Sequence, residues 1–224
     1  MSETVTEKTH NYVPVIEAKP EPKSVVDYIS EPRKLDAPRA DATPEELYNE
    51  LIRIYRSYKP EGDTELIKKA YEVACRQHKD QKRKSGEPYI IHPLNTAIII
   101  AEIEMDKEAI CAALLHDVVE DTNMTLDEIR EMFGDHVALL VDGVTKLTQL
   151  SLDVDKIEIQ AENLRKMFVA MAKDIRVVLI KLADRLHNLR TLQYQSKAKQ
   201  IEKATETMEI YSPLAERLGI MKLK

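Results

Sequence analysis

Apolar residues recur every three to four positions over most of the chain from Thr43 onward, which is the spacing of helices that bury one face. No segment keeps the alternation of apolar and polar positions that a half-buried strand requires. The pattern predicts helices over about 44–58, 64–79, 93–103, 107–121, 126–133, 136–149, 156–172, 176–194 and 197–218. We therefore expect an all-α fold with essentially no sheet.

Residues that favour helix ends stand at several of these boundaries. Short polar side chains suited to the N-cap precede five of the helices, at Thr43, Asp63, Asp106, Thr125 and Ser196. Glu128 completes a capping box with Thr125, and Gly134 is placed to end that helix. Pro213 cannot donate a backbone hydrogen bond, so we expect it to bend the last helix.

The beginning of the chain has a different composition. Six of the ten prolines fall within the first 44 residues, where apolar side chains are isolated among charges of both signs. Such a segment buries too little surface to offset its loss of entropy on ordering. We expect residues 1–42 to form a flexible, disordered extension; a short docking motif at 25–29 is the alternative. The rest divides into a domain over 43–195 and a C-terminal helix within 196–224.

Composition narrows the class of protein further. A content of 43% hydrophobic residues in 224 allows a substantial core, while five glycines are too few for a dinucleotide-binding fold. Lys and Arg total 33 against 39 Asp and Glu, so no overall positive field attracts nucleic acid or an anionic membrane. Cys75 and Cys111 are predicted to be reduced core thiols. No apolar run is close to the length needed to span a bilayer, and the run at 97–101 is far too short, so we expect a cytoplasmic protein.

One predicted helix carries a cluster of ionisable side chains. Because each helical residue advances about 100°, an arc of roughly 140° contains four of them, namely His116, Asp117, Glu120 and Asp121. No lysine or arginine is interleaved with the acids, so their mutual repulsion requires a counter-charge. A divalent cation would supply it. Imidazole and carboxylate ligands together suit Mn²⁺, Fe²⁺, Co²⁺ or Zn²⁺ better than Ca²⁺.

Other parts of the chain must complete such a metal site. His92 directly precedes Pro93 at a predicted helix start, and Asp184 lies on a largely apolar helix, where an isolated carboxylate is costly. Taken singly, each residue has a simpler interpretation. The histidines could be a turn residue and a hydrogen-bonded core residue, the aspartates could be salt-bridge partners, and the acidic pair could be a solvated helix end. The combination of these residues is what favours a metal centre.

The same residues lie in longer motifs that resemble a known family. The motifs are RKSGEPYIIHP (83–93), LLHDVVEDT (114–122), LVDGVTKL (140–147), IKLADRLHNLRTL (180–192) and IYSPLAERLGIMKLK at the end. They are similar to the HD hydrolase superfamily and, more closely, to the hydrolase domain of the RelA/SpoT homologue (Rel) family of alarmone enzymes. The resemblance covers about 43–224. It implies an all-helical HD domain that binds Mn²⁺ and removes the 3′-pyrophosphate from guanosine tetra- and pentaphosphate (ppGpp and pppGpp).

The resemblance also implies roles for individual residues. It implies four metal ligands, which are His92, His116, Asp117 and Asp184. The resemblance implies that Glu120 and Asp121 are an acidic catalytic pair. It also implies that the nucleotide is contacted by Arg83, Lys84, Ser85, Asn188 and Thr191. Lys181 and Arg185 flank Asp184, and either could neutralise phosphate or serve as a structural partner.

The sequence therefore predicts a manganese-dependent enzyme that hydrolyses ppGpp or pppGpp to GDP or GTP and pyrophosphate. In long members of the family a synthetase domain follows the hydrolase domain, so we expect 196–224 to lead toward such a domain in a full-length protein. Two other functions remain open. The chain could be an HD phosphohydrolase of another nucleotide, or a module that senses the alarmone without cleaving it.

Overall fold

The structure, a computed structural model, describes residues 42–149, 169 and 173–219. Within these ranges the chain forms helices and no strand, and one isolated β-bridge joins Lys82 to Pro88. The all-α expectation is confirmed. None of the helices in the described ranges is long and apolar enough to cross a membrane.

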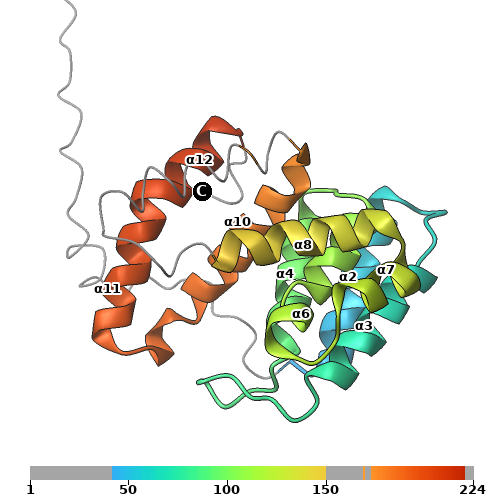
Figure 1. Ribbon diagram of the computed structural model, residues 1–224, viewed down its shortest axis with the longest axis horizontal. Helices are drawn as coiled ribbons and strands as arrows, with labels where there is room; N and C mark the ends of the chain where they lie inside the picture. Colours follow the sequence, from blue (N-terminus) through green and yellow to red (C-terminus); the bar gives the residue numbers. More distant parts are fainter. Residues whose placement is uncertain (1–41, 150–168, 170–172, 220–224) are drawn as a thin grey trace, which may run out of the picture. The chain divides into compact units, whose positions relative to one another are not determined.

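The helices follow one another along the chain as Figure 1 shows. They are α2 (Pro44–Tyr58), α3 (Glu65–Gln77), α4 (Ile91–Glu102), α5 (Lys107–Leu115), α6 (Val118–Asp121), α7 (Leu126–Phe133), α8 (Asp135–Gln149), α10 (Ile175–Arg190), α11 (Lys197–Glu206) and α12 (Ser212–Arg217). A 3₁₀ turn, η1 (Leu192–Tyr194), follows α10, and a π-helical turn, η2 (Thr207–Tyr211), joins α11 to α12.

Side-chain caps explain where several helices begin. Thr43 and Thr125 each form both hydrogen bonds of a capping box with the glutamate three residues later. Asp106 and Ser196 accept backbone hydrogen bonds at the starts of α5 and α11. Gly134 ends α7 with a φ of 85°, a conformation that glycine adopts without strain. These predicted caps are confirmed.

Two helix starts differ from the prediction. Asp63 accepts a bond from the amide of Glu65 at 2.9 Å, but the N-cap position of α3 is Thr64. Helix α4 begins at Ile91, before Pro93, because proline in a first turn lacks only an amide that has no helical partner there. His92 consequently lies within the first turn of α4, not ahead of it.

The predicted continuous helix over 107–121 is wrong, since it is divided into α5 and α6 at His116 and Asp117. The imidazole explains the break. His116 Nδ1 lies 2.8 Å from the carbonyl oxygen of Ala113, which is the acceptor that the Asp117 amide would use in an uninterrupted helix. The backbone at both residues stays in the right-handed helical region, so α6 continues in nearly the same direction.

The C-terminal helices are also shorter than predicted. Helix α10 ends at Arg190, and its last predicted residues form η1. The single helix predicted over 197–218 is divided by η2, in which the amide of Ser212 bonds to the carbonyl of Thr207. Pro213, which was expected to bend this helix, lies two residues after the end of the π-helical turn. A residue that donates no hydrogen bond favours such a local rearrangement. The predicted boundary at 195/196 falls between η1 and α11 and stays a prediction.

Two predicted segments fall almost entirely outside the described residues. They are the N-terminal extension over 1–42, of which only Ala42 is described, and the helix over 156–172, of which only Val169 is described. Both remain predictions.

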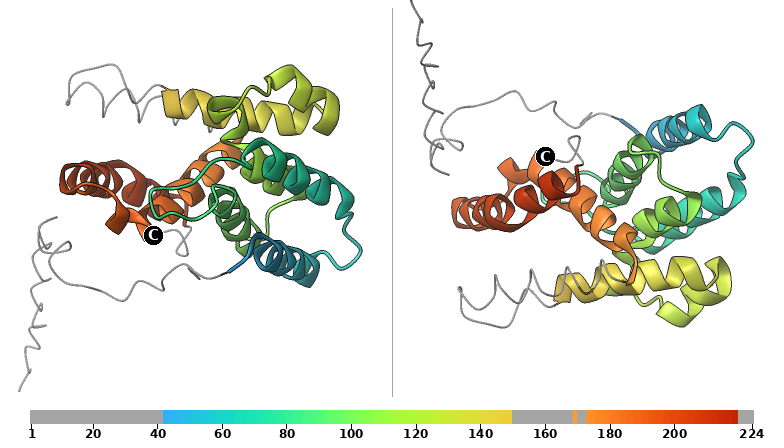
Figure 2. Two further views of the ribbon diagram at one scale, coloured as in Figure 1. Left: turned by 90° about the horizontal axis from the view of Figure 1, so that it is seen from below. Right: turned by 90° about the horizontal axis from the view of Figure 1, so that it is seen from above.

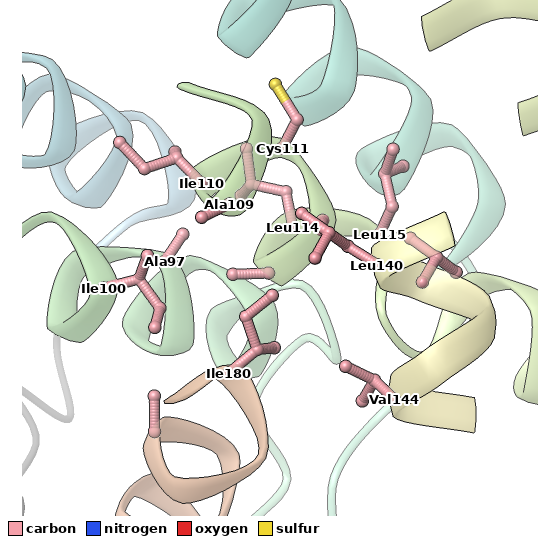
Figure 3. Packing of buried hydrophobic residues seen from close by; sticks show 14 of the residues in the cluster. Ala97, Ile100, Ala109, Ile110, Cys111, Leu114, Leu115, Leu140, Val144 and Ile180 are labelled. Carbon is pink, nitrogen blue, oxygen red and sulfur yellow. The ribbon is translucent and has the colours of Figure 1, made fainter. Parts of the chain in front are cut away.

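The core lies where α4 and α5 meet their neighbours. Helix α4 packs against α2, α5 and α10, and α5 also packs against α3 and α8. Figure 2 shows α2 and α8 on opposite sides of the layer that α4, α5 and α10 form. Ile100, Leu114, Leu140 and Ile180, from four different helices, are all fully buried in this core (Figure 3). Cys111 is buried and Cys75 half-buried, and both are free thiols.

Candidate metal centre

Three segments bring together the four residues that were expected to bind a metal. His92 comes from the first turn of α4, His116 and Asp117 from the break between α5 and α6, and Asp184 from the middle of α10. His92 Nε2 lies 3.2 Å from Asp184 Oδ1 and 3.5 Å from Asp117 Oδ2. His116 Nε2 lies 3.2 Å from Asp117 Oδ1. Donor atoms of His92, His116 and Asp184 all lie within 4.8 Å of one another.

The hydrogen bonds of His116 fix which of its nitrogens carries the proton. Its Nδ1 lies 2.8 Å from the Ala113 carbonyl oxygen, which can only accept, so Nδ1 carries the hydrogen. In a neutral ring Nε2 then holds a lone pair. This atom is buried and has no hydrogen-bond partner among the described residues. His116 is only 1% exposed, so a lone pair without a partner is costly unless a cation binds it.

A similar argument fixes the proton of His92. Its Nδ1 lies 2.8 Å from Nδ1 of His187, and Arg83 Nη1 lies 3.3 Å from that same His187 atom. An arginine can only donate, so His187 Nδ1 accepts, and His92 Nδ1 must carry the hydrogen. Burial lowers the pKa of His92, which keeps the ring neutral. Its Nε2 therefore also presents a lone pair to the carboxylates of Asp117 and Asp184.

Asp184 is ionised although it is buried. Burial raises its pKa, but the Lys181 ammonium 2.8 Å away and the contact with His92 hold that pKa well below its usual range. Asn188 Nδ2 donates to the other carboxylate oxygen, so Asp184 is oriented from its own helix. Two imidazole lone pairs and two carboxylates thus converge on one place. This donor set fits a divalent transition metal ion.

The acidic pair stands at the edge of this centre. Glu120 and Asp121 lie on α6, one turn beyond Asp117, and Asp121 is exposed while Glu120 is half-buried. Asp121 is connected to the centre by Tyr89, whose hydroxyl lies 2.7 Å from Asp121 Oδ2 and 2.8 Å from Asp117 Oδ2. Neither member of the pair is among the residues that line the adjacent cavity. Their catalytic role stays a prediction.

Tyr89 is a residue of this site that the sequence reasoning missed. Its ring stacks on His78 with centroids 4.6 Å apart, and His78 Nδ1 lies 2.8 Å from Gln81 Oε1. Gln81 donates from Nε2 to the carbonyl of Asp121. Burial, with the nearby carboxylates, raises the pKa of Tyr89, so its hydroxyl stays protonated and donates. The only available signal was its place in the motif before His92.

His187 is a second residue that the sequence reasoning did not assign to the site. It is fully buried, and its Nε2 has no hydrogen-bond partner in the described part of the chain. Burial, together with the positive charge of Arg83 and the nearby His92, lowers its pKa to about 2, so the ring is neutral. Its position three residues after Asp184, on the same helix face, was the signal that could have found it.

A cavity of about 440 Å³ opens beside the centre and is lined by Tyr89, His92, Asp117 and Asp184 on one side. Its lining also contains Asn188, three leucine or glutamine residues, and seven basic residues, which are Lys82, Arg83, Lys84, Lys181, Arg185, Lys199 and Lys203. Among the described residues of this lining, the only acids are the two aspartates of the metal centre. Such a cavity favours an anionic ligand of nucleotide size.

Three of the five residues expected to contact a nucleotide line this cavity, namely Arg83, Lys84 and Asn188, while Thr191 lies outside its lining. Arg83 Nη2 donates to Asn188 Oδ1 at 2.9 Å and to Thr191 Oγ1 at 3.1 Å. Lys84 Nζ donates to Gln195 Oε1 at 2.9 Å. Ser85 is outside the lining, and its Oγ is buried with no hydrogen-bond partner among the described residues. Their contacts with a ligand stay predictions.

The two basic residues that flank Asp184 differ in their surroundings. Lys181 bonds to Asp184 directly. Arg185 pairs with Glu206 at 2.6 Å and lies over the ring of Tyr211, 4.3 Å from its centroid. These contacts favour a structural role for Arg185, which joins α10 to the C-terminal helices.

An all-helical fold with histidines and aspartates converging beside a basic cavity defines a candidate metal-dependent protein that binds anions. The chain belongs to the HD domain family, whose model matches residues 70–221.

Similar proteins include long alarmone enzymes. The chain is 53% identical over 169 residues to the GTP pyrophosphokinase of Myxococcus xanthus, a match that covers 75% of this chain and 22% of that protein. It is 52% identical over 178 residues to the bifunctional (p)ppGpp synthase/hydrolase SpoT of Escherichia coli K12, covering 80% of this chain and 25% of SpoT. The chain thus spans about a fifth to a quarter of these relatives. The resemblance to the Rel family is confirmed.

A solved structure is also similar. It is a metazoan ortholog of SpoT, described as hydrolysing ppGpp and having a role in starvation responses. The TM-score is 0.51 and the sequence identity 29%, and the match covers 64% of this chain and 84% of that one. Because most of that protein is matched, its overall fold corresponds to the helical domain of this chain.

Proposed function

We propose that this chain is a manganese-dependent hydrolase that removes the 3′-pyrophosphate of ppGpp and pppGpp. The observation that carries the proposal is the convergence of the lone pairs of His92 Nε2 and His116 Nε2 with the carboxylates of Asp117 and Asp184. These atoms lie beside a cavity whose lining contains seven basic side chains. The metal centre would engage the scissile phosphate while the basic residues hold the rest of a polyphosphate.

The relatives support hydrolysis as the reaction of this region. Several are named GTP pyrophosphokinase, but this chain spans only about a fifth of their length. The metazoan protein described as hydrolysing ppGpp is matched over 84% of its chain. We therefore assign hydrolysis to this region and infer that the synthetase activity of the longer relatives belongs to another part of them. In a longer protein, that part would adjoin this domain.

The residues of the site would divide between metal binding and proton transfer. His92, His116, Asp117 and Asp184 would hold the ion. A divalent ion bound there supplies Lewis-acid polarisation of the phosphoryl group and lowers the pKa of water. Water attacks phosphorus, the bond to the 3′ oxygen breaks, the 3′ oxygen takes a proton, and pyrophosphate leaves. Glu120 and Asp121 are the groups that accept and return protons in this reaction.

Substrate recognition would fall to the loop before α4 and the end of α10. Arg83 presents a planar guanidinium that stacks on a purine or bonds a phosphate at two points, and Lys84 adds a point charge. Asn188 and Thr191, which hold Arg83 in the structure, would fix the position of that guanidinium against the nucleotide. Tyr89 would keep Asp117 and Asp121 in a fixed relation.

The test is an assay of pyrophosphate and GDP released from ppGpp by the metal-stripped protein, with and without added Mn²⁺. We expect release only with the metal, its loss on chelation, and its recovery when Mn²⁺ is returned. The Asp184→Asn variant should release no pyrophosphate at any metal concentration. Absence of release with any divalent metal would reject the proposal.

Two further assays separate the rival functions. Faster turnover of deoxynucleoside triphosphates or cyclic nucleotides than of ppGpp would identify a different nucleotide phosphohydrolase. The double variant Glu120→Gln, Asp121→Asn should bind ppGpp but release no pyrophosphate. If the unmodified protein also binds ppGpp without releasing pyrophosphate, the chain is an alarmone sensor and not an enzyme.

A further inference from the structure

His187 occupies a position in α10 where it contacts a candidate metal ligand and the nucleotide loop at once. Its Nδ1 lies 2.8 Å from His92 Nδ1 and 3.3 Å from Arg83 Nη1. Both neighbours donate to the same lone pair, so His187 Nδ1 has no capacity left to bind a metal ion. His187 therefore acts on the metal centre only through another residue.

The bond between the two histidines determines which nitrogen of His92 faces the centre with a lone pair. With the proton held on His92 Nδ1, Nε2 is free to bind a cation. With the proton on Nε2, this atom would donate to Asp184 Oδ1 at 3.2 Å or to Asp117 Oδ2 at 3.5 Å, and the site would lose one ligand. The usual partner of a metal-binding histidine is a carboxylate or a backbone carbonyl. Here it is a neutral imidazole.

Arg83 determines which tautomer His187 adopts. A neutral imidazole has two tautomers, and His187 would serve as a donor if its own Nδ1 carried the proton. The guanidinium of Arg83 cannot accept a hydrogen bond, so its contact with Nδ1 selects the tautomer of His187 that accepts. Arg83 is itself anchored by Asn188 and Thr191 at the end of α10. The selection therefore passes from Arg83 through His187 to His92.

We propose that His187 is a positioning residue whose Nδ1 holds the proton of His92 on Nδ1 and thereby keeps His92 Nε2 available as a metal ligand. This inference rests on the proposed metal centre for its function, but its structural part concerns the protein without metal. The two parts can therefore be tested separately.

The first measurement is the tautomer of His92 in metal-free protein, from the nitrogen chemical shifts of ¹⁵N-histidine-labelled protein by NMR. The signals of His92 are assigned by their loss in His92→Gln. We expect a protonated Nδ1 and an unprotonated Nε2 in the unmodified protein. A proton on Nε2 would overturn the inference, and this result needs no variant of His187.

The second measurement is the Mn²⁺ affinity of two His187 variants, determined by titration calorimetry. His187→Leu fills the buried space but removes the acceptor, and we expect it to weaken Mn²⁺ binding by roughly 10- to 100-fold. His187→Asn keeps an oxygen near the Nδ1 position and should stay within a few-fold of the unmodified protein. Thr145→Val, which changes another buried polar residue, on α8, should leave the affinity unchanged.

The outcomes distinguish the inference from the proposed function. Equal losses in His187→Leu and His187→Asn would indicate a merely structural residue and overturn the inference, as would no loss in either. If the unmodified protein binds no Mn²⁺, the metal-centre proposal fails. The tautomer measurement still decides whether His187 orients His92.

Discussion

The hydroxyl of Tyr89 joins the candidate metal centre to the acidic turn that follows it. One O–H group lies within 2.8 Å of two carboxylates, those of Asp117 and Asp121. A single proton between two negative groups reduces their repulsion and holds both at a fixed separation. The hydroxyl is thus the one link that the structure provides, among its described residues, between the side chains of Asp117 and Asp121.

Tyr89→Phe should weaken the site without unfolding the protein. The ring can still stack on His78, but both carboxylates lose a hydrogen bond. We expect pyrophosphate release from ppGpp to fall about 10- to 100-fold, the range for loss of a group that orients a metal ligand. Tyr58→Phe removes a hydroxyl that bonds to the Met105 carbonyl and should leave release unchanged. Equal rates in the two variants would contradict this role of Tyr89.

At the residue scale, the sequence predicts hydrogen bonds between residues that are close together along the chain. The capping bonds of Thr43, Thr125 and Ser196 each join residues three positions apart, so composition and spacing reveal them. Tyr89 and Asp117 are 28 positions apart, and the two histidines His92 and His187 are 95 apart. Their hydrogen bonds exist only because helices pack together, and no local pattern contains them.

At the scale of elements, one arginine fixes two helix starts together. Asp174 caps α10, and Asp106 caps α5. Arg176 bonds to both carboxylates, at 2.6 Å in each case. His116 directly follows α5, and α10 carries Asp184, so this contact helps to hold together the two helices that position these candidate metal ligands.

Asp174→Asn should destabilise the fold in a pH-dependent way. Asparagine still caps a helix, so the variant removes mainly the charge that Arg176 contacts. The bond from Arg176 lowers the pKa of Asp174, so its contribution is present above the unfolded-state pKa near 4 and is lost as pH falls through the lower folded-state pKa. We expect a loss of about 1 kcal/mol at pH 7 by urea denaturation. The difference should shrink steadily below about pH 4, and a constant difference would contradict this account.

Gly143 permits the close approach of α8 and α10. A Cβ at this position would lie 2.7 Å from Val177 Cγ2 and 3.0 Å from Cγ1. Alanine normally favours a helix over glycine, but here Gly143→Ala should cost about 1–3 kcal/mol in the free energy of unfolding because of overpacking. The double variant with Val177→Ala should recover part of that loss in urea denaturation. A stabilised Gly143→Ala would contradict the packing.

The elements themselves were predictable except where a side chain or proline changes the backbone. The break at His116 and Asp117 was missed because it depends on an imidazole bonding to Ala113, whereas the apolar spacing continues through it. A bend of the last helix was expected at Pro213, but its division by a π-helical turn was not. The helix over 156–172 stays a prediction.

At the scale of the whole molecule, the candidate metal centre connects α4, the α5–α6 break and α10, and helices α4, α5 and α10 pack against one another in the core. Binding an ion there should therefore stabilise the fold, because the ligands converge only in the folded state. At a free Mn²⁺ concentration 100 times the Kd, the gain is about 2.7 kcal/mol. For a chain of this size we expect Tm to rise by about 5–10 °C.

The measurement is thermal unfolding of metal-stripped protein with increasing Mn²⁺. Asp184→Asn removes one carboxylate charge from the centre, so its Tm should respond far less. Equal shifts in the two proteins would mean that the ion binds elsewhere.

The sequence alone could not place these three segments together. Periodicity predicts helices but not which of them meet, so the cluster at 116–121 indicated a metal but could not show that His92 and Asp184 lie beside it. His92 and Asp184 were candidate ligands that the resemblance to the Rel family favoured, and the structure brings both to the HD doublet. The seven basic residues of the cavity come from several elements, and the sequence did not predict that Lys199 and Lys203 would line it.

The central claim is that two histidines and two aspartates hold one divalent ion. The most direct test is a crystal structure of the protein grown with Mn²⁺, with anomalous diffraction measured at the manganese absorption edge. We predict an anomalous peak that marks a manganese ion within bonding distance of His92 Nε2, His116 Nε2 and the carboxylates of Asp117 and Asp184. A peak bonded to other residues, or no peak in crystals that diffract well, would contradict the account.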